Sequence, residues 1–502
     1  MTQLRQSLKS FWQSISSLPT RWYLVGILAI ATIARLISLT KASIWHDEGF
    51  TMMLMRHDVA DIIARTARDV HPPLYYIVTH WWSILFSDSE FAIRGLSLLF
   101  GLGIVILTYF IVKRLKFSES TARLSTLLVA IGPFLVRYSQ EARMYSMAAL
   151  LVCAATLVML IALDISKKQS MRRQLLWWLA YGALMAAGLY THYYVVFIIP
   201  VHIGYAIFRF GGISKLVKSK SWWSGNLLAT LLFIPWIPSL ISQFTRVQSG
   251  FWIPPADAET IPTTLMQFSI FNGNIVPSSV EMLLMLAFAC ILTAVIVRMK
   301  KRSNLVFLTA WAFLPLLLVL LISLKQPVYY DRYFVYASVA FYIILAVLIM
   351  HKNIRTWMKG ILIALVCLVS IIGIYNVYTQ ANHAMRDVGS YVSANYQPGD
   401  VLVSAELYTY FDFSYYNKTN QPVKLLSAEP LSGYGETSLL YDNQRNIVVN
   451  SLSDIQPSSS QKRIWVIGKT GEHDYFSKDI PTSWELLDQK QAGDSAVRLY
   501  SL

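Results

Sequence analysis

The chain has 502 residues, of which 55% are hydrophobic and 14% are charged, and its formal net charge is +15. Its apolar residues gather in blocks of about 17 to 22 residues, the length that an α-helix needs to cross a bilayer. This composition argues against a soluble domain and indicates a polytopic α-helical membrane protein. The basic residues fall in the short gaps between apolar blocks, so we interpret them as topology signals and expect no nucleic-acid partner.

The hydropathy pattern predicts eleven spans. They are expected near 22–40, 95–113, 121–137, 144–164, 174–190, 193–209, 222–242, 280–297, 304–323, 333–350 and 358–377. Gaps rich in Lys and Arg alternate with gaps poor in them, which predicts a multi-pass protein of the plasma (inner) membrane with a cytoplasmic N-terminus. The apolar stretch from Pro72 to Phe86 is short and opens with two prolines, so we assign it as a juxtamembrane or re-entrant helix at the outer surface.

This topology divides the chain into two predicted domains. Residues 1–377 form a transmembrane catalytic domain with external loops at 41–94 and 243–279; the second loop contains "GFWIPP" and "FNGNIVP". After the last span, residues 378–502 contain short β-like runs such as "DVLVSA", "NIVVNS" and "RIWVIG" between turn residues. We therefore expect a small extracytoplasmic α/β domain at the C-terminus.

Charged and aromatic residues collect at the predicted outer ends of the spans. The span centres carry almost no charge, which argues against a proton relay or an ion path across the membrane. The outer junctions are "WHDEGF" (45–50), "DVHPPLYY" (69–76), "RYSQEARMY" (137–145), "YTHYY" (190–194) and "YYDRYF" (329–334). The residues predicted to line a site there are His46, His71, Tyr75, Glu141, Tyr145, His192, Tyr193, Tyr330 and Asp331.

The adjacent acids Asp47 and Glu48 are the candidate catalytic residues. A carboxylate at the membrane edge can act as a general base towards an attacking hydroxyl. Two other interpretations stay open at this point. Asp47 can instead cap a helix that begins at Gly49, and the two acids with His46 and His71 are of the types that bind a divalent metal, although no spacing specifies such a site.

Arg143 and Arg332 are the candidate phosphate-binding residues. Each lies next to an acid and to tyrosines at the start of a span. One interpretation is a side chain that anchors its span in an aromatic belt. The other is a phosphate clamp, because the guanidinium fork matches phosphate oxygens in a bidentate way that lysine does not.

The order of these motifs resembles the GT-C superfamily of polytopic glycosyltransferases. The resemblance is to the bacterial protein O-mannosyltransferase and aminoarabinose transferase group, which is family 39-like. It extends over nearly the whole chain, from "HDE" and "HPPLYY" through Glu90 and Arg94, "YSQEARMY" and "RYF" to "RDVGSYV" and "QPGD" within 386–400. It implies a GT-C helical fold, a catalytic carboxylate at Asp47, and arginines that hold the phosphate of a lipid carrier.

The predicted function is an inverting membrane glycosyltransferase. It would move a mannose or pentose-type sugar from a polyprenyl monophosphate carrier to a hydroxyl of a protein, lipid or glycan acceptor at the outer membrane face. A polyprenyl phosphate leaves as an anion that cations can stabilise, so one carboxylate suffices. No cofactor is required by this scheme, although a divalent metal stays possible. The alternatives are an oligosaccharide transferase that uses a polyprenyl diphosphate, and a flippase or transporter of lipid-linked sugars.

Overall fold

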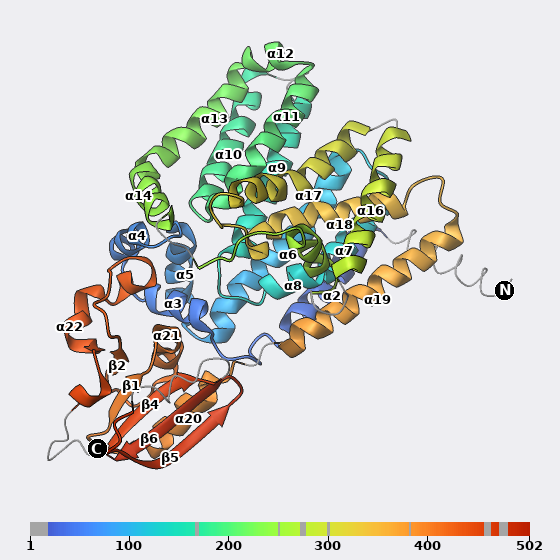
Figure 1. The fold of residues 1–502 in the computed structure, drawn as a ribbon. Coiled ribbons are helices and arrows are strands. Elements are labelled where there is room, and N and C mark those ends of the chain that lie inside the picture. Colours follow the sequence, from blue (N-terminus) through green and yellow to red (C-terminus); the bar gives the residue numbers. More distant parts are fainter. Residues whose placement is uncertain are drawn as a thin grey trace. The chain divides into compact units, whose positions relative to one another are not determined.

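The computed structural model describes residues 19–165, 170–248, 252–271, 278–298, 302–380, 383–455, 463–470 and 480–501. Most of "FNGNIVP" and the first two residues of "GFWIPP" lie outside these ranges. The chain divides into two compact units (Figure 1). The membrane unit comprises residues 1–37 and 94–378, and the second unit comprises residues 38–93 and 379–502.

The membrane unit is built from helices. They are α2 (Thr20–Leu36), α6 (Glu90–Arg114), α7 (Glu119–Ile131), α8 (Pro133–Tyr138), α9 (Tyr145–Ile165), α10 (Met171–Leu189), η1 (Tyr193–Ile198), α11 (Ile199–Phe210), α12 (Ile213–Val217), α13 (Lys220–Phe233), η2 (Ile234–Trp236), α14 (Ile237–Gln248), α15 (Thr260–Ile270), α16 (Ser278–Arg298), α17 (Arg302–Ser323), η3 (Asp331–Phe334), α18 (Val335–Ile349) and α19 (Thr356–Gln380). Helix occurs at each of the eleven predicted spans. Within the described residues, seven helical runs are long and apolar enough to cross a membrane, which confirms a multi-pass protein.

The predicted span 121–137 is interrupted by a non-helical residue. The range 121–137 is divided between α7 and α8 at Gly132 and Pro133. Proline has no backbone N–H and its ring clashes with the preceding turn, so it starts a new helix here instead of continuing α7. The break leaves backbone carbonyls near the end of α7 that other side chains can bind.

Glycines allow α10 and α13 to pack closely. A Cβ on Gly182 would lie 2.0 Å from the carbonyl oxygen of Gly225, and a Cβ on Gly225 would lie 2.2 Å from that of Trp178. Helices in lipid associate through packing of small residues because the lipid chains are as apolar as the side chains. The two glycines therefore determine how closely these helices approach each other.

The second unit combines the first loop with the C-terminal region. The loop contributes α3 (His46–Leu54), α4 (Val59–Arg68) and α5 (Leu74–Leu85). The C-terminal region contributes α20 (Met385–Asn395), α21 (Leu407–Tyr416), η4 (Gly435–Leu439), η5 (Tyr441–Asn443), α22 (Gln444–Ile447), η6 (Leu452–Asp454) and the strands β1 (Val401–Ser404), β2 (Val423–Leu426), β3 (Val448–Val449), β4 (Arg463–Lys469), β5 (Glu485–Ala492) and β6 (Ser495–Ser501). The predicted α/β region at the C-terminus is confirmed.

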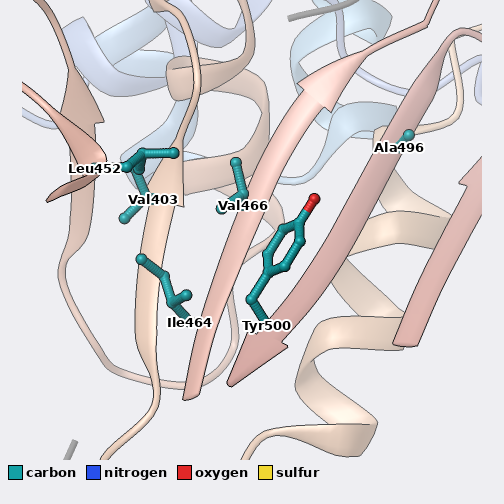
Figure 2. Packing of buried hydrophobic residues seen from close by; sticks show 6 residues of the cluster. All are labelled: Val403, Leu452, Ile464, Val466, Ala496 and Tyr500. Atoms are coloured by element: carbon teal, nitrogen blue, oxygen red, sulfur yellow. The ribbon is translucent and has the colours of Figure 1, made fainter. Parts of the chain in front are cut away.

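The six strands form one mixed sheet in the order β3-β2-β1-β4-β6-β5. The β1–β2, β1–β4 and β2–β3 pairs are parallel, whereas β6 runs antiparallel to both β4 and β5. Figure 2 shows a buried apolar cluster of this sheet, which consists of Val403, Leu452, Ile464, Val466, Ala496 and Tyr500. The central strand β4 is buried along most of its length, which explains why "RIWVIG" reads as a continuous apolar run.

The first loop packs on the C-terminal region. Helix α3 contacts α21, and α4 contacts η4. Gly49 makes the first contact possible, because a Cβ there would lie 2.8 Å from the backbone nitrogen of Asp412 and 2.9 Å from Phe411. The compact units thus divide the chain differently from the predicted domains, since the loop was assigned by sequence to residues 1–377. The pattern of apolar spans shows where the chain leaves the membrane, but it carries no information on what an external loop packs against.

Candidate active site

The predicted catalytic acids lie in the first turn of α3. The helix begins at His46 and its N-cap is Trp45, which makes no capping side-chain hydrogen bond. The helix therefore does not begin at Gly49, and Asp47 is not its N-cap. Carboxylates in the first turn are favoured by the positive end of the helix dipole. Glu48 is fully buried, whereas Asp47 is half-buried and is thus the more accessible of the two acids.

His46 joins α3 to the C-terminal region. Its Nε2 lies 2.5 Å from a carboxylate oxygen of Glu436, and its ring packs at 4.6 Å from the ring of Tyr408. Burial disfavours the charged imidazolium, but the hydrogen bond and charge of Glu436, with the charges of Asp47 and Asp412, outweigh burial and raise the pKa of His46. A cation is therefore stabilised directly beside the candidate base.

Asp412 on α21 adds a further carboxyl group to this region. It is 2% exposed, and burial raises its pKa to about 6 against the opposing charges of Lys469 and His46. Its Oδ1 is buried and accepts no hydrogen bond from the part of the chain that the structure describes. A carboxyl group in this state binds a proton near neutral pH far more readily than a surface aspartate does.

His71 and Tyr75 follow α4 in the first loop. His71 Nδ1 lies 3.4 Å from a carboxylate oxygen of Asp69, whose side chain is almost completely buried. Tyr75 is fully buried in α5, with its ring 5.8 Å from that of Tyr76. The aspartate can hold one orientation of the histidine ring, while Tyr75 contributes packing.

An aromatic cage surrounds Arg332 in the membrane unit. Its guanidinium carbon lies 4.5 Å from the ring centre of Tyr330, 5.6 Å from that of Tyr145 and 5.8 Å from that of Trp252. Arg332 is 9% exposed. Its backbone N–H donates to the Asp331 carboxylate at 2.7 Å, which fixes the start of η3. Stacking on ring faces holds the plane of a guanidinium, whose edge carries the N–H donors that match phosphate oxygens.

Arg143 lies close to this cage along the chain. It is two residues from Tyr145, so the two Cα atoms are within about 7 Å of each other. Both Arg143 and Glu141 are buried in the segment that links α8 to α9. Glu141 forms an ion pair with Arg137 in α8 at 2.5 Å.

The "YTHYY" motif packs on the same region. The ring of His192 lies 6.0 Å from that of Tyr145 and 4.8 Å from that of Tyr333, so the structure brings His192 to the cage. Tyr193 instead places its hydroxyl against α14, where it donates to Gln243 at 2.5 Å and accepts from Trp236 at 2.7 Å.

One group of described residues has the geometry to hold a metal ion. The ligand atoms of His46, Asp47 and Glu436 lie within 4.8 Å of one another. Imidazole and carboxylate ligands suit a divalent transition metal. This group shares two members with the sequence-based set but takes Glu436 in place of Glu48 and His71.

Sequence reasoning did not single out several residues of these regions. Trp252 and Tyr333 lie inside the motifs "GFWIPP" and "YYDRYF", so an aromatic next to a candidate arginine was the available signal. Glu436 and Asp412 stand in stretches without a recognisable motif. They lie near His46 only because α21 and η4 pack on α3.

The family model of dolichyl-phosphate-mannose-protein mannosyltransferases matches residues 70–238. This range covers "HPPLYY", "YSQEARMY" and "YTHYY". A search of curated proteins found no significant match by sequence.

Solved structures share the fold. ArnT from Cupriavidus metallidurans in the apo state superposes with a TM-score of 0.68 at 13% identity, over 96% of this chain and 98% of that one. The same protein bound to undecaprenyl phosphate gives 0.63 at 13% identity with the same coverage. The Archaeoglobus fulgidus oligosaccharyltransferase tethered to an acceptor peptide gives 0.51 at 12% identity, over 89% of this chain and 68% of that one.

These comparisons confirm the predicted fold class and the resemblance to the GT-C superfamily. The family model that matches residues 70–238 is that of a mannosyltransferase, which supports the predicted class of enzyme. At 12 to 13% identity the neighbours define the fold, and the chemistry of this chain must be argued from its own residues.

Proposed function

We propose that this protein is an inverting glycosyltransferase that takes a sugar from a polyprenyl monophosphate and transfers it to an acceptor hydroxyl. The observation that carries the proposal is the buried Arg332 in its aromatic cage. One ring of that cage, Tyr145, is two residues from the buried Arg143. Two arginines match the charge that develops on a departing phosphate.

In the proposed reaction Asp47 is the general base. It accepts the proton of the acceptor hydroxyl while that oxygen forms a bond to the anomeric carbon of the sugar. The bond between that carbon and the phosphate oxygen breaks on the opposite face, so the configuration inverts. The electron pair leaves with the polyprenyl phosphate, whose negative charge Arg143 and Arg332 stabilise.

Neighbouring residues support these roles. Glu48, which is fully buried, orients Asp47 or the sugar in this scheme. The charge of Asp47 contributes to the raised pKa of His46, so the proposed base lies beside a stabilised cation. Tyr145 and Tyr330 hold the guanidinium plane of Arg332, which lowers the entropy lost when the phosphate binds.

The same features support a monophosphate donor. ArnT, whose fold this chain shares, is bound to undecaprenyl phosphate in one of its structures. We assign the donor as a polyprenyl monophosphate that carries mannose or a pentose-type sugar, and the acceptor as a protein, lipid or glycan. The distribution of basic residues favours a cytoplasmic N-terminus in the inner membrane, with the acceptor reaction outside.

A metal ion at His46, Asp47 and Glu436 would occupy a lone pair of the proposed base. The proposal therefore predicts that activity persists after dialysis against a chelator. Loss of activity that Mn²⁺ or Zn²⁺ restores would instead assign these three residues to metal binding.

The proposal can be tested by the release of polyprenyl phosphate in lipid nanodiscs. The wild-type protein would be incubated with a panel of polyprenyl phosphate sugars and a crude acceptor extract, and the released lipid measured by mass spectrometry. We expect one donor class to be consumed. Asp47→Asn should reduce its turnover by roughly 100-fold or more, while the surface variant Asp387→Asn should behave like the wild type.

Arginine variants test the clamp separately. Arg332→Lys keeps the charge but loses the planar fork, so we expect roughly tenfold weaker binding of polyprenyl phosphate. Arg355→Lys, an exposed residue between α18 and α19, is the matched control. Normal turnover by a folded Asp47→Asn protein would refute the role of Asp47 as the general base. Release only from diphosphate donors, or movement of the donor across liposomes without sugar transfer, would favour the alternative functions.

A further inference from the structure

A buried arginine of the membrane unit has no role in the proposed reaction. Arg35 lies in the last turn of α2 and is 0% exposed. Among the described residues no carboxylate forms an ion pair with it. Its Nε donates to Ser139 Oγ at 3.2 Å, and its Nη1 donates to the carbonyl oxygens of Ala31 at 3.1 Å and Ala130 at 2.7 Å. A charge inside a membrane-spanning segment is costly, so it usually serves a function.

The partners of Arg35 lie around the break between α7 and α8. Ala130 is in the last turn of α7, where the break interrupts the helical hydrogen bonds. Ser139 follows α8 directly and donates its hydroxyl to the Leu135 carbonyl at 2.5 Å. One guanidinium therefore connects α2, the end of α7 and the end of α8.

Gln140, the residue after Ser139, binds the backbone at the end of α2. Gln140 Nε2 donates to the carbonyl oxygens of Arg35 at 2.9 Å and Ile37 at 2.7 Å. The first two residues of the 139–144 segment are thus bound to α2, one through the arginine side chain and one through the carbonyls at the helix end. At the other end, Ser146 donates to the Tyr138 carbonyl at 2.7 Å and closes the segment.

Gly101 on α6 leaves the space that this arrangement needs. A Cβ at this position would lie 2.2 Å from Ser139 Oγ and 2.9 Å from Arg35 Nε. Any larger residue would push both groups away, so the hydrogen bond between Arg35 and Ser139 depends on a glycine in a third helix.

We infer that Arg35 is a positioning residue for Arg143. It fixes the start of the 139–144 segment, and that segment presents the buried Arg143 to the donor phosphate. The inference rests on the proposed function, in which Arg143 binds that phosphate. Arg35 acts through Ser139 and does not itself touch the substrate.

Lysine cannot replace this arginine. The guanidinium donates from Nε and Nη1 in different directions at fixed angles, whereas an ammonium is a single point at the end of a flexible stem. Arg35→Lys therefore keeps the charge and the approximate length but loses the simultaneous bonds to Ser139 and Ala130. This substitution tests the geometry of the contact separately from its charge.

The experiment measures the affinity of full-length protein in nanodiscs for a sugar-free polyprenyl monophosphate, together with the KM for the acceptor and the thermal midpoint. We expect Arg35→Lys and Ser139→Ala each to weaken phosphate binding by roughly tenfold, as for one lost charge-assisted hydrogen bond. The acceptor KM should not change. Arg209→Lys, at an arginine that binds Asp164 at 2.5 Å in another part of the unit, is the control and should leave the phosphate affinity unchanged.

A double-mutant cycle identifies the route of the effect. In an Arg143→Ala background, Arg35→Lys should weaken phosphate binding no further, because the residue through which it acts is missing. Full additivity, or a lower thermal midpoint with normal phosphate affinity, would overturn the positioning role. Normal affinity in Arg143→Ala alone would refute the proposed clamp and the inference with it. Should Arg35→Lys fail to fold, Ser139→Ala and Gly101→Ala test the same contact.

Discussion

Replacement of Asp412 by asparagine should stabilise the protein at neutral pH. The carboxyl group is buried beneath α3 and its pKa is raised to about 6, against an ordinary value of 3.8. Asparagine has nearly the same shape and carries no charge to desolvate. The variant thus removes the cost of ionising a buried acid, while it leaves the backbone of α21 packed against Gly49.

The folded and unfolded pKa values of Asp412 give the size of the stability difference and the direction in which it changes with pH. Between pH 3.8 and about 6 the unfolded chain has lost this proton and the folded protein still holds it, so stability falls as pH rises. The interval of about 2 pH units corresponds to about 3 kcal/mol, which is fully present above pH 6. For a unit of this size, this free energy is equivalent to a rise of about 6 to 12 °C in Tm.

The assay is thermal unfolding of full-length protein in nanodiscs, followed by tryptophan fluorescence from pH 4 to pH 7.5. The difference in Tm between Asp412→Asn and wild type should be near zero at pH 4, grow to pH 6 and then stay constant. Asp387→Asn on the exposed face of α20 is the control. His46 titrates in a different window, because its raised pKa makes its stabilising contribution decline only as pH rises beyond the ordinary value of 6.5.

A difference in Tm that does not depend on pH would exclude a raised pKa of Asp412. Such a result would mean that Asp412 is ionised throughout, with its charge balanced by His46 and Lys469. A variant less stable than wild type at pH 7.5 would lead to the same conclusion.

Three further substitutions test the second unit by the same thermal assay. Glu90→Gln should cost about 2 kcal/mol of stability, because the Glu90 carboxylate accepts hydrogen bonds from Arg386 at 3.1 and 2.5 Å. The cost is below that of a fully buried ion pair because Arg386 is only partly buried. An unchanged Tm would mean that the ion pair adds nothing to stability. Val466→Ala should cost about 2 kcal/mol at every pH, since Val466 is 1% exposed in the sheet core, and a loss below 0.5 kcal/mol, roughly the level of a surface substitution, would contradict its packing there. Asp400→Asn should cost about 1 to 2 kcal/mol near pH 7, because burial of Asp400 is outweighed by the hydrogen bonds from Arg463, which lower the pKa of Asp400. The loss should shrink as pH falls below the ordinary value of 3.8 and through the lowered pKa, and a loss that does not change with pH would exclude an electrostatic origin.

The apolar blocks and short β-like runs were sufficient to predict the fold class. The reason is physical: a bilayer requires about 20 apolar residues for each helical crossing, and a buried strand requires a short apolar run, so both leave a local pattern. The break at Gly132 and Pro133 also had a local signal, the Gly-Pro dipeptide. The prediction of one span over 121–137 did not take it into account.

The same local rules located Asp47 and Arg332. Asp47 lies in the short polar stretch after the apolar block 22–40, and Arg332 lies directly before the block 333–350 with aromatic neighbours in the motif "YYDRYF". Charged residues this close to apolar blocks are unusual enough to stand out. What the residues do remains a prediction from their chemistry, since position in the sequence does not report the protonation state or the neighbours of a side chain.

The contacts of these residues were decided only by the tertiary structure. His46 and Glu436 are 390 positions apart, and Arg35 and Ser139 are 104 positions apart. Periodicity shows which face of an element is apolar, but not which other element covers it. Gly49 and Gly101 illustrate the difference, because each reads as an ordinary glycine in the sequence and becomes indispensable only where a second helix or an arginine occupies the space of its missing side chain.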